Sequence, residues 1–285
     1  EPAISSTRGY PRSCCFHSGR LVFGGTRDLP NFIFASKTSD YFNFDAGEAA
    51  DDDSIQVQIL ESQVSEITGV LSFRHLLVFT DNSELYSPTS ANAPLTPSNV
   101  SFRRQTRYGT SRLQAKEFDE AIVFLSKGKK SLREFTYDDI KQAYLSPSVS
   151  LLSGHLIDNP VGLEIQTEND QGQESYAYII NGDGSLAVYM AMRNEKIASW
   201  SKWTTNGEYK NIISINGLVF AIVKRTIDGA VVYLLELFDS SLTLDASETL
   251  TSGSATASWT GLDHLDDTVV KVVSGNYSLG SKTVG

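Results

Sequence analysis

The chain has 285 residues, of which 40% are hydrophobic and 20% are charged, and its formal net charge at pH 7 is −10. This composition is that of a globular protein, and the length suits one large all-β domain or two smaller domains. The acidic balance disfavours specific nucleic-acid binding because a negative surface repels phosphates. No apolar run approaches the roughly 20 residues of a membrane-spanning helix, so no membrane-spanning segment is expected.

Strand-like runs dominate the chain. They are rich in Val, Ile, Phe, Tyr and Thr, and Gly, Asn, Asp and Ser bound them, which is typical of short β-strands. The runs gather into about five blade-like units, at intervals of roughly 40–50 residues, and a four-stranded propeller blade needs about that length. The units cover residues 20–59, 66–88, 113–137, 162–205 and 209–238.

Two hairpins can be predicted from local sequence. The turn Asn181-Gly182-Asp183-Gly184 should join strands over 177–180 and 186–189. Further along, the apolar run 219–224 should pair with the run 231–235 across a second tight turn.

Short helices are expected only near residues 138–156, over Asp138–Tyr144 and Ser148–Leu156, where Pro147 fits a helix start. After Phe238 the chain becomes rich in Ser, Thr, Leu and Gly. We therefore expect an irregular β-propeller domain over 1–240. Residues 241–285 should form a linker and the start of a further β domain, both ends being cut from a longer chain. A sandwich or a set of stacked sheets is the structural alternative.

No constellation of catalytic or metal-binding residues is evident. The four histidines lie in separate segments, and no nucleophile elbow or His-Glu-x-x-His motif is present. The acidic run Asp51-Asp52-Asp53 is a possible Ca²⁺ ligand set, but a solvated turn is the commoner outcome. From the residues we expect no catalytic site, no cofactor and no metal, and therefore not an enzyme.

The basic stretch Arg103-Arg104-Gln105-Thr106-Arg107-Tyr108-Gly109 stands out in this acidic chain. A phosphate-binding loop, a catalytic cluster and a structural hinge are the three interpretations. No helix start or glycine-rich cradle adjoins it, which weakens the phosphate site. Arginine suits bidentate bonds to carboxylates. We therefore expect Arg103, Arg104 and Arg107 to clamp acidic or carbonyl groups between successive blades, beside Tyr108, with Gly109 making the turn.

Segments spread over nearly the whole chain resemble, in the same order, those of one family of tail proteins from short-tailed bacteriophages. The segments are Gly9–Arg12, Phe16–Thr26, Pro30, Ser39–Phe44, Asp52–Ile55, His75–Thr80, Leu95–Pro97, Arg104–Thr106 with Tyr108-Gly109, Val123-Phe124, Arg133–Asp138, Leu151–Leu156, Trp200–Thr205 and Gly261–Leu265. The family is the tail tubular protein B, or nozzle, group, also called packaged-DNA stabilisation proteins.

The resemblance implies a structural virion protein built around an irregular propeller. It would form a ring, usually of six copies, at the distal tail tube, where it would contact the tube and the tail fibres. DNA would pass through this ring during ejection without specific binding, which an acidic lumen favours. The implied location is the virion tail, and the host cytoplasm during assembly. The resemblance implies no catalytic residues.

Two other functions remain open from the residues. A carbohydrate-binding or polysaccharide-cleaving propeller at the host surface is one alternative, since Trp200, Trp203 and Trp259 are candidates to stack on sugars, although packing in strands is their commoner role. A scaffold for protein partners outside a virion is the other.

Overall fold

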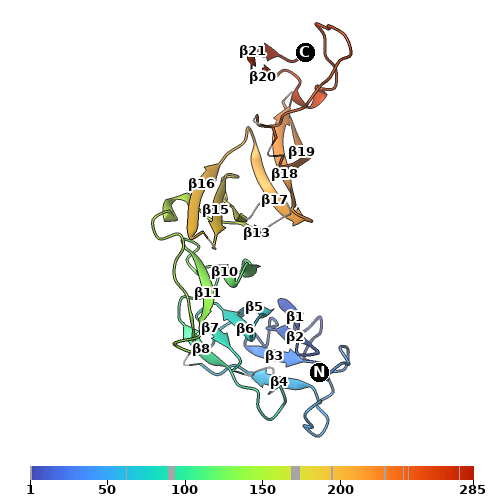
Figure 1. Ribbon diagram of the computed structural model, residues 1–285. Coiled ribbons are helices and arrows are strands. Elements are labelled where there is room, and N and C mark those ends of the chain that lie inside the picture. Colours follow the sequence, from blue (N-terminus) through green and yellow to red (C-terminus); the bar gives the residue numbers. More distant parts are fainter. Residues whose placement is uncertain are drawn as a thin grey trace. The chain divides into compact units, whose positions relative to one another are not determined.

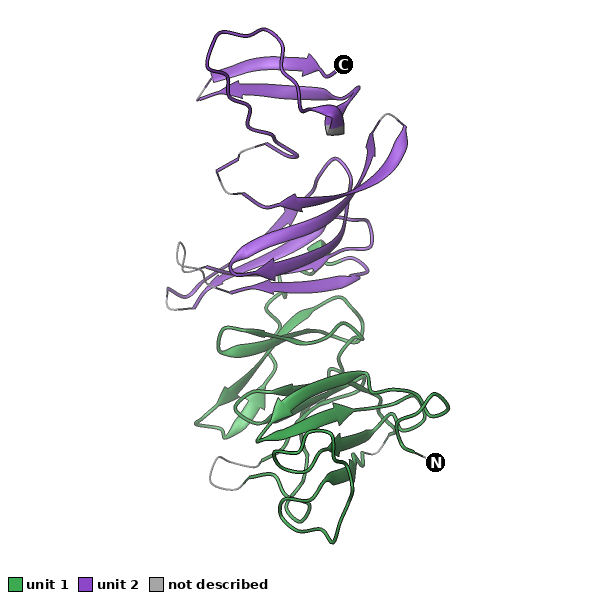
Figure 2. Cartoon of the chain, turned by 90° about the vertical axis from the view of Figure 1, so that its right-hand side faces the viewer, with its two compact units in different colours: residues 1–157 green, residues 158–285 purple. Residues whose placement is uncertain are grey.

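The computed structural model describes residues 2–61, 63–88, 94–167, 174–193, 195–227, 229–239, 241–242, 244–275 and 277–285 (Figure 1). The chain divides into two compact units, Glu1–Ile157 and Asp158–Gly285 (Figure 2). The sequence places a domain boundary near residue 240, where the composition changes. The boundary between the compact units lies between the third and fourth sheets.

The first unit contains three four-stranded antiparallel sheets, and the strands of each follow chain order. The first sheet holds β1 (Ser13–His17), β2 (Arg20–Gly24), β3 (Phe32–Ala35) and β4 (Ile55–Gln58). The second holds β5 (Ile67–Ser72), β6 (Leu76–Thr80), β7 (Glu84–Tyr86) and β8 (Arg103–Thr106). The third holds β9 (Lys116–Phe118), β10 (Ala121–Leu125), β11 (Leu132–Asp138) and β12 (Ala143–Leu145).

The second unit contains sheets of four, three and two strands. The four-stranded sheet holds β13 (Gly162–Gln166), β14 (Ser175–Ile180), β15 (Leu186–Met192) and β16 (Ile197–Trp203). The three-stranded sheet holds β17 (Glu208–Ile215), β18 (Leu218–Ile227) and β19 (Ala230–Leu237). The last pair is β20 (Val269–Ser274) and β21 (Tyr277–Thr283).

The fold is all-β and propeller-like, as the sequence predicts. Four successive four-stranded meanders and one three-stranded meander match the five predicted units. Both predicted hairpins are confirmed, because Ile180 pairs with Leu186 and Val223 pairs with Leu234. The described part of the chain contains no helix long and apolar enough to cross a membrane.

Within each unit, the hydrophobic cores lie between neighbouring sheets. Val22 of the first sheet and Val78 of the second belong to one buried cluster, while Phe79 and Phe124 join the second sheet to the third. In the second unit, a third cluster packs the β13–β16 sheet against the β17–β19 sheet. Strands β6 and β10 are buried on both faces, which explains why their sequences are continuous apolar runs instead of alternating ones.

The expected helix over Asp138–Tyr144 does not form. This segment is the end of β11, a turn and the start of β12, with Tyr137 paired to Tyr144. Oδ1 of Asp138 accepts hydrogen bonds from the backbone N–H groups of Ile140 and Lys141, both at 3.0 Å. Acidic side chains bind backbone N–H groups in this way at turns as well as at helix starts. Within the expected helix Ser148–Leu156, only Gly154–Leu156 is helical, as one 3-10 turn.

Candidate functional site

The basic stretch forms the outermost strand of the second sheet. Strand β8 pairs with β7, and the register shifts by one residue between Glu84, which pairs with Thr106, and Leu85, which pairs with Arg104. From the sequence we expect this stretch to lie where one blade leads to the next. The structure makes its first four residues part of a blade, followed by a turn toward the third sheet.

A buried carboxylate holds this strand and the turn after it. Glu84 has no exposed surface and accepts hydrogen bonds from the Thr106 hydroxyl, from the Tyr108 backbone N–H at 3.3 Å and from the Thr110 hydroxyl at 3.5 Å. Burial raises the pKa of Glu84, while these bonds and the charge of Arg133 oppose that rise. Sequence reasoning missed Glu84. Its only signal is a lone acid within a short, otherwise apolar strand.

Gly109 makes a left-handed turn, as predicted for it. Its φ is +68°, and a Cβ at this position would lie 2.2 Å from the carbonyl oxygen of Asp81. Its own carbonyl accepts a bond from the Lys127 N–H, and the next N–H, of Thr110, donates to the Thr80 carbonyl, both at 2.8 Å. The turn therefore ties the second sheet to the third, and only glycine fits there without displacing the backbone.

The three arginines differ in their contacts. Nη1 of Arg104 lies 3.4 Å from Oε1 of Glu61. For Arg103 and Arg107, which are exposed, the described residues include no side-chain hydrogen bond or ion pair. The predicted clamp on acidic groups thus corresponds to Arg104 alone, and Glu84 holds the rest of the segment through hydroxyl and backbone groups.

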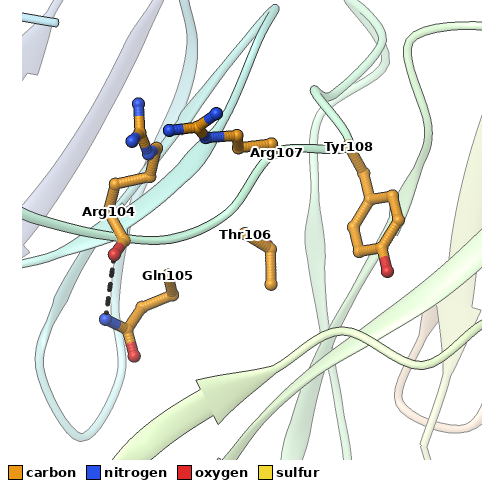
Figure 3. Close-up of a pocket in the computed structure, with 5 residues that line it drawn as sticks. All are labelled: Arg104, Gln105, Thr106, Arg107 and Tyr108. Atoms are coloured by element: carbon orange, nitrogen blue, oxygen red, sulfur yellow. Dashed lines mark hydrogen bonds between the residues drawn. The ribbon is translucent and has the colours of Figure 1, made fainter.

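Residues Arg104 to Tyr108 line a pocket of about 560 Å³ (Figure 3). In the view of Figure 3, the guanidinium groups of Arg104 and Arg107 are on one side and Tyr108 is on the other. The Tyr108 ring is 48% exposed, and the guanidinium carbon of Arg133 lies 3.3 Å from its centroid. The lining therefore combines cationic donors with an aromatic ring, which suits an anionic or polyhydroxylated ligand.

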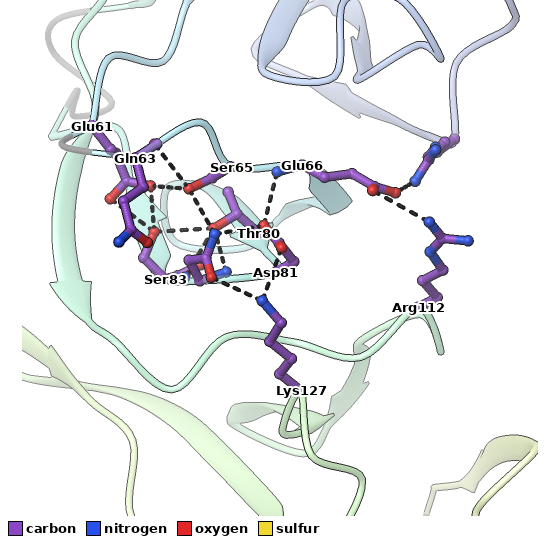
Figure 4. Close-up of polar contacts among 11 residues, drawn as sticks. Glu61, Gln63, Ser65, Glu66, Thr80, Asp81, Ser83, Arg112 and Lys127 are labelled. Atoms are coloured by element: carbon purple, nitrogen blue, oxygen red, sulfur yellow. Dashed lines mark hydrogen bonds and ion pairs between the residues drawn. The ribbon is translucent and has the colours of Figure 1, made fainter.

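Glu61, the partner of Arg104, belongs to a polar network around the second sheet (Figure 4). The Glu61 side chain is 8% exposed and accepts bonds from the hydroxyls of Ser65 and Ser83 at 2.9 and 2.8 Å. Lys127, from the third sheet, donates to Asp81 at 3.0 Å. These bonds join the loop before β5, the β6–β7 turn and the third sheet.

A buried arginine binds the backbone of the acidic run. The guanidinium of Arg20, which is 1% exposed, donates to the backbone carbonyls of Asp51 at 2.7 Å, Asp53 at 2.5 Å and Ser36 at 2.7 Å. The Asp53 carboxylate pairs with Lys37 at 2.8 Å. Among the described residues, no group of three or more His, Cys, Asp or Glu side chains is arranged to hold a metal.

His75 belongs to an aromatic cluster. Its Nδ1 lies 2.9 Å from the Tyr144 hydroxyl, and its ring contacts those of Tyr86, Tyr137 and Tyr144. Burial, followed by the nearby charge of Arg74, lowers the pKa of His75. The side chain of His264 lies outside the described residues. His75 is therefore packed among aromatic side chains.

The tryptophans differ in exposure. Trp203 packs in the core of the second unit against Tyr178 and Phe238, and Trp200 stacks on Tyr189. Trp259 is 47% exposed. Of the three, Trp259 therefore offers the most open ring.

No protein-family model and no curated protein sequence matches the chain. Among solved structures, a Lactobacillus plantarum protein is 10% identical with a TM-score of 0.45, over 83% of this chain and 73% of its own. An exo-β-1,3-galactanase from Phanerochaete chrysosporium is 10% identical with a TM-score of 0.40, over 82% and 61%. A PQQ-bound aldose sugar dehydrogenase from Streptomyces coelicolor is 10% identical with a TM-score of 0.35, over 83% and 86%.

These likenesses concern the fold and carry no activity over to this chain. They do correct one expectation. Two of these three similar structures are enzymes by name. The expectation that this chain is not an enzyme is therefore wrong, because an all-β chain without a recognisable catalytic motif is not thereby a non-enzyme.

Proposed function

We propose that the chain is a structural component of a short phage tail, part of a nozzle-type ring at the distal tail tube through which DNA passes during ejection. The observation that supports this most is where the residues of the family resemblance lie. Several of them lie at close contacts between or within sheets, where few other side chains would fit. The partners in this role are further copies in a ring of six, the tail tube and the tail fibres.

Three close contacts carry that argument. Arg20 fixes the loop that ends at Asp53 through backbone carbonyls. A Cβ on Gly24 would lie 2.6 Å from Val70 in the second sheet, so the first two sheets approach closely there. Gly109 meets the Asp81 backbone in the same way. The residues of the resemblance that lie at these close contacts preserve the packing of the sheets. A structural ring protein depends on that packing.

The charge agrees with the role. A conduit that lets a duplex slide should repel phosphates, and a net charge of −10 does so on average. Specific readout of bases would instead need clustered cationic side chains in contact with DNA.

Imaging of assembled particles tests this proposal. We expect reconstructed density for tails to accommodate the two compact units at the distal end of the tube, in six copies. The native mass of the whole protein should give the same stoichiometry. A protein that never forms rings and never enters particles would overturn the proposal.

A carbohydrate-binding or polysaccharide-cleaving propeller at the host surface is the second candidate. The pocket beside Arg107 and Tyr108 favours it, because an unpaired guanidinium and an exposed ring suit an acidic sugar. Binding of capsular polysaccharide that is lost in Arg107→Ala but kept in Arg27→Ala would support this candidate, and release of reducing sugar would add cleavage. No binding and no release would contradict it.

A further inference from the structure

The three-stranded sheet of the second unit exposes an apolar face. Ile213 and Leu218 are 49% and 51% exposed, Tyr233 is 64% exposed and Leu235 is 72% exposed. These are large apolar side chains within regular strands, where one covered face and one polar face would be the ordinary arrangement. Single exposed leucines are normal on a protein surface, whereas a contiguous exposed apolar face usually marks an interaction site.

The strand register places these side chains on one face. Ile222 pairs with Leu235 and Phe220 pairs with Leu237 across β18 and β19, while Ile213 pairs with Phe220 across β17 and β18. Directly paired residues in antiparallel strands share a face. The alternate residues of β18, including Val219, Ala221 and Val223, point the other way and are buried in the core with the preceding sheet.

The face exceeds an ordinary surface patch. Eight large apolar residues of these strands are 39–72% exposed: Ile213, Ile215, Leu218, Ile222, Val231, Tyr233, Leu235 and Leu237. Together they present on the order of 800 Å², whereas the largest patch on a typical monomer is about 300–600 Å². The same area is about one partner's share of a standard protein interface. No strand in the described part of the chain pairs with the outer edge of β19, so the sheet is also one strand shorter than those before it.

The first sheet offers a contrast. Its outward side chain Phe23 is half-buried and stacks on Phe44 of the loop between β3 and β4, with ring centroids 5.4 Å apart. On the β17–β19 face, Tyr233 and Leu235 are 64% and 72% exposed in the described part of the chain.

We propose that a second copy of the chain packs on this face, sheet against sheet, about a two-fold axis. The strands are apolar over most of their length. In their charged group, Glu208 and Lys210 lie at the start of β17, while Lys224 pairs with Tyr233 across β18 and β19 and donates to Glu208. A two-fold axis brings the apolar stretch of one copy onto the same stretch of the other. Glu208 and Lys210, at the start of the outer strand β17, then lie toward the rim, where polar residues of an interface are normally found. This pairing does not depend on the proposed function.

Sedimentation velocity of the 285-residue chain over a range of concentrations tests the pairing. We expect a monomer–dimer equilibrium with a dissociation constant on the order of 1 μM or tighter for an apolar interface of this size. Leu235→Glu should weaken it at least tenfold, because a charge would be buried against its own copy. Leu152→Glu is the matched control, since Leu152 is 91% exposed in the other unit and should leave the dimer unchanged.

Circular dichroism of both variants establishes that each remains folded, so that loss of the dimer can be read as loss of the interface. A chain that stays monomeric at about 100 μM, far above that constant, would overturn the proposal. So would an equally tight dimer in Leu235→Glu, or open-ended assembly that grows with concentration, which is the mark of a head-to-tail contact.

Discussion

Thr106 and Glu84 hydrogen-bond to each other at the place where β7 and β8 shift register. The hydroxyl donates to Oε2 of the carboxylate, and the backbone N–H of Tyr108, two residues on, donates to the same oxygen. One buried carboxylate therefore fixes both the end of an edge strand and the turn that leads to the next sheet.

Replacing Glu84 should show how much this contact stabilises the first unit. Glu84→Ala leaves three donors without an acceptor, so we expect a loss of about 3 kcal/mol in the free energy of unfolding. Glu84→Gln keeps one acceptor oxygen and should lose less. Chemical denaturation measures both. Equal stability of Glu84→Ala and the wild type would refute the assigned role.

Gly109→Ala should be more destabilising than the conformation alone explains. Gly229 has nearly the same φ, +70°, but a Cβ there would meet nothing within 4 Å. Gly229→Ala therefore isolates the left-handed strain, about 1 kcal/mol. Gly109→Ala adds the collision with the Asp81 carbonyl, and we expect about 3 kcal/mol or more in total. Equal losses in thermal denaturation of the two variants would contradict the close approach.

Arg20→Met should loosen the loop that it binds. The variant keeps much of the apolar stem but leaves buried carbonyl oxygens unpaired, at a cost of about 3 kcal/mol. Arg27→Met serves as control, since the Arg27 side chain is 63% exposed. Limited proteolysis should cut near residues 45–53 in Arg20→Met but not in the control. Unchanged protection would argue against the loop being held by Arg20.

Arg104→Ala should cost less than 1 kcal/mol. Its contact with Glu61 is 3.4 Å long, and its side chain is 33% exposed, so solvent screens the pair. Glu61 keeps its serine donors in the variant. A loss above 2 kcal/mol by chemical denaturation would mean that the pair is stronger than its geometry indicates.

Stability should fall as the pH is lowered below about 6.5, the ordinary histidine value. The pKa values of His75 and His17 are lowered, chiefly by burial, so the unfolded chain binds protons more readily in that range. Protons then favour unfolding until the lowered pKa is passed. The raised pKa of Glu84 acts in the opposite direction, above about 4.5.

The melting temperature at about pH 7 and about pH 5.5 checks this, with His75→Gln as the comparison. The variant should lose part of the difference between the two pH values. If its difference equals that of the wild type, His75 does not contribute to the dependence.

The sequence predicted those parts of the fold that local patterns determine. The hairpin at 181–184 follows from turn residues between two apolar runs, and both signals lie within a dozen residues. Strand β8 carries no apolar alternation. Its place depends on pairing with β7 and on the Gln105 side chain, whose Oε1 accepts a bond from the Tyr144 N–H at 2.7 Å, 39 residues away. Such contacts leave no local pattern, which is why Glu84 also escaped notice.

The incorrect helix over 138–144 has a different cause. Asp138 binds the next N–H groups in a turn just as it would at a helix start, so the two outcomes share one local signature. Pairing between Tyr137 and Tyr144 decides between them, and that contact depends on the rest of the third sheet.

The contacts of Arg20 also determine which amino acids the loop at Asp51 and Asp53 can contain. Its guanidinium binds the main-chain oxygens of Asp51 and Asp53, and every amino acid carries such an oxygen. The Asp51 side chain is therefore free to drift over evolutionary time, whereas Arg20 is not. In relatives that share this fold, an invariant arginine facing a variable loop would be the mark of the same contact.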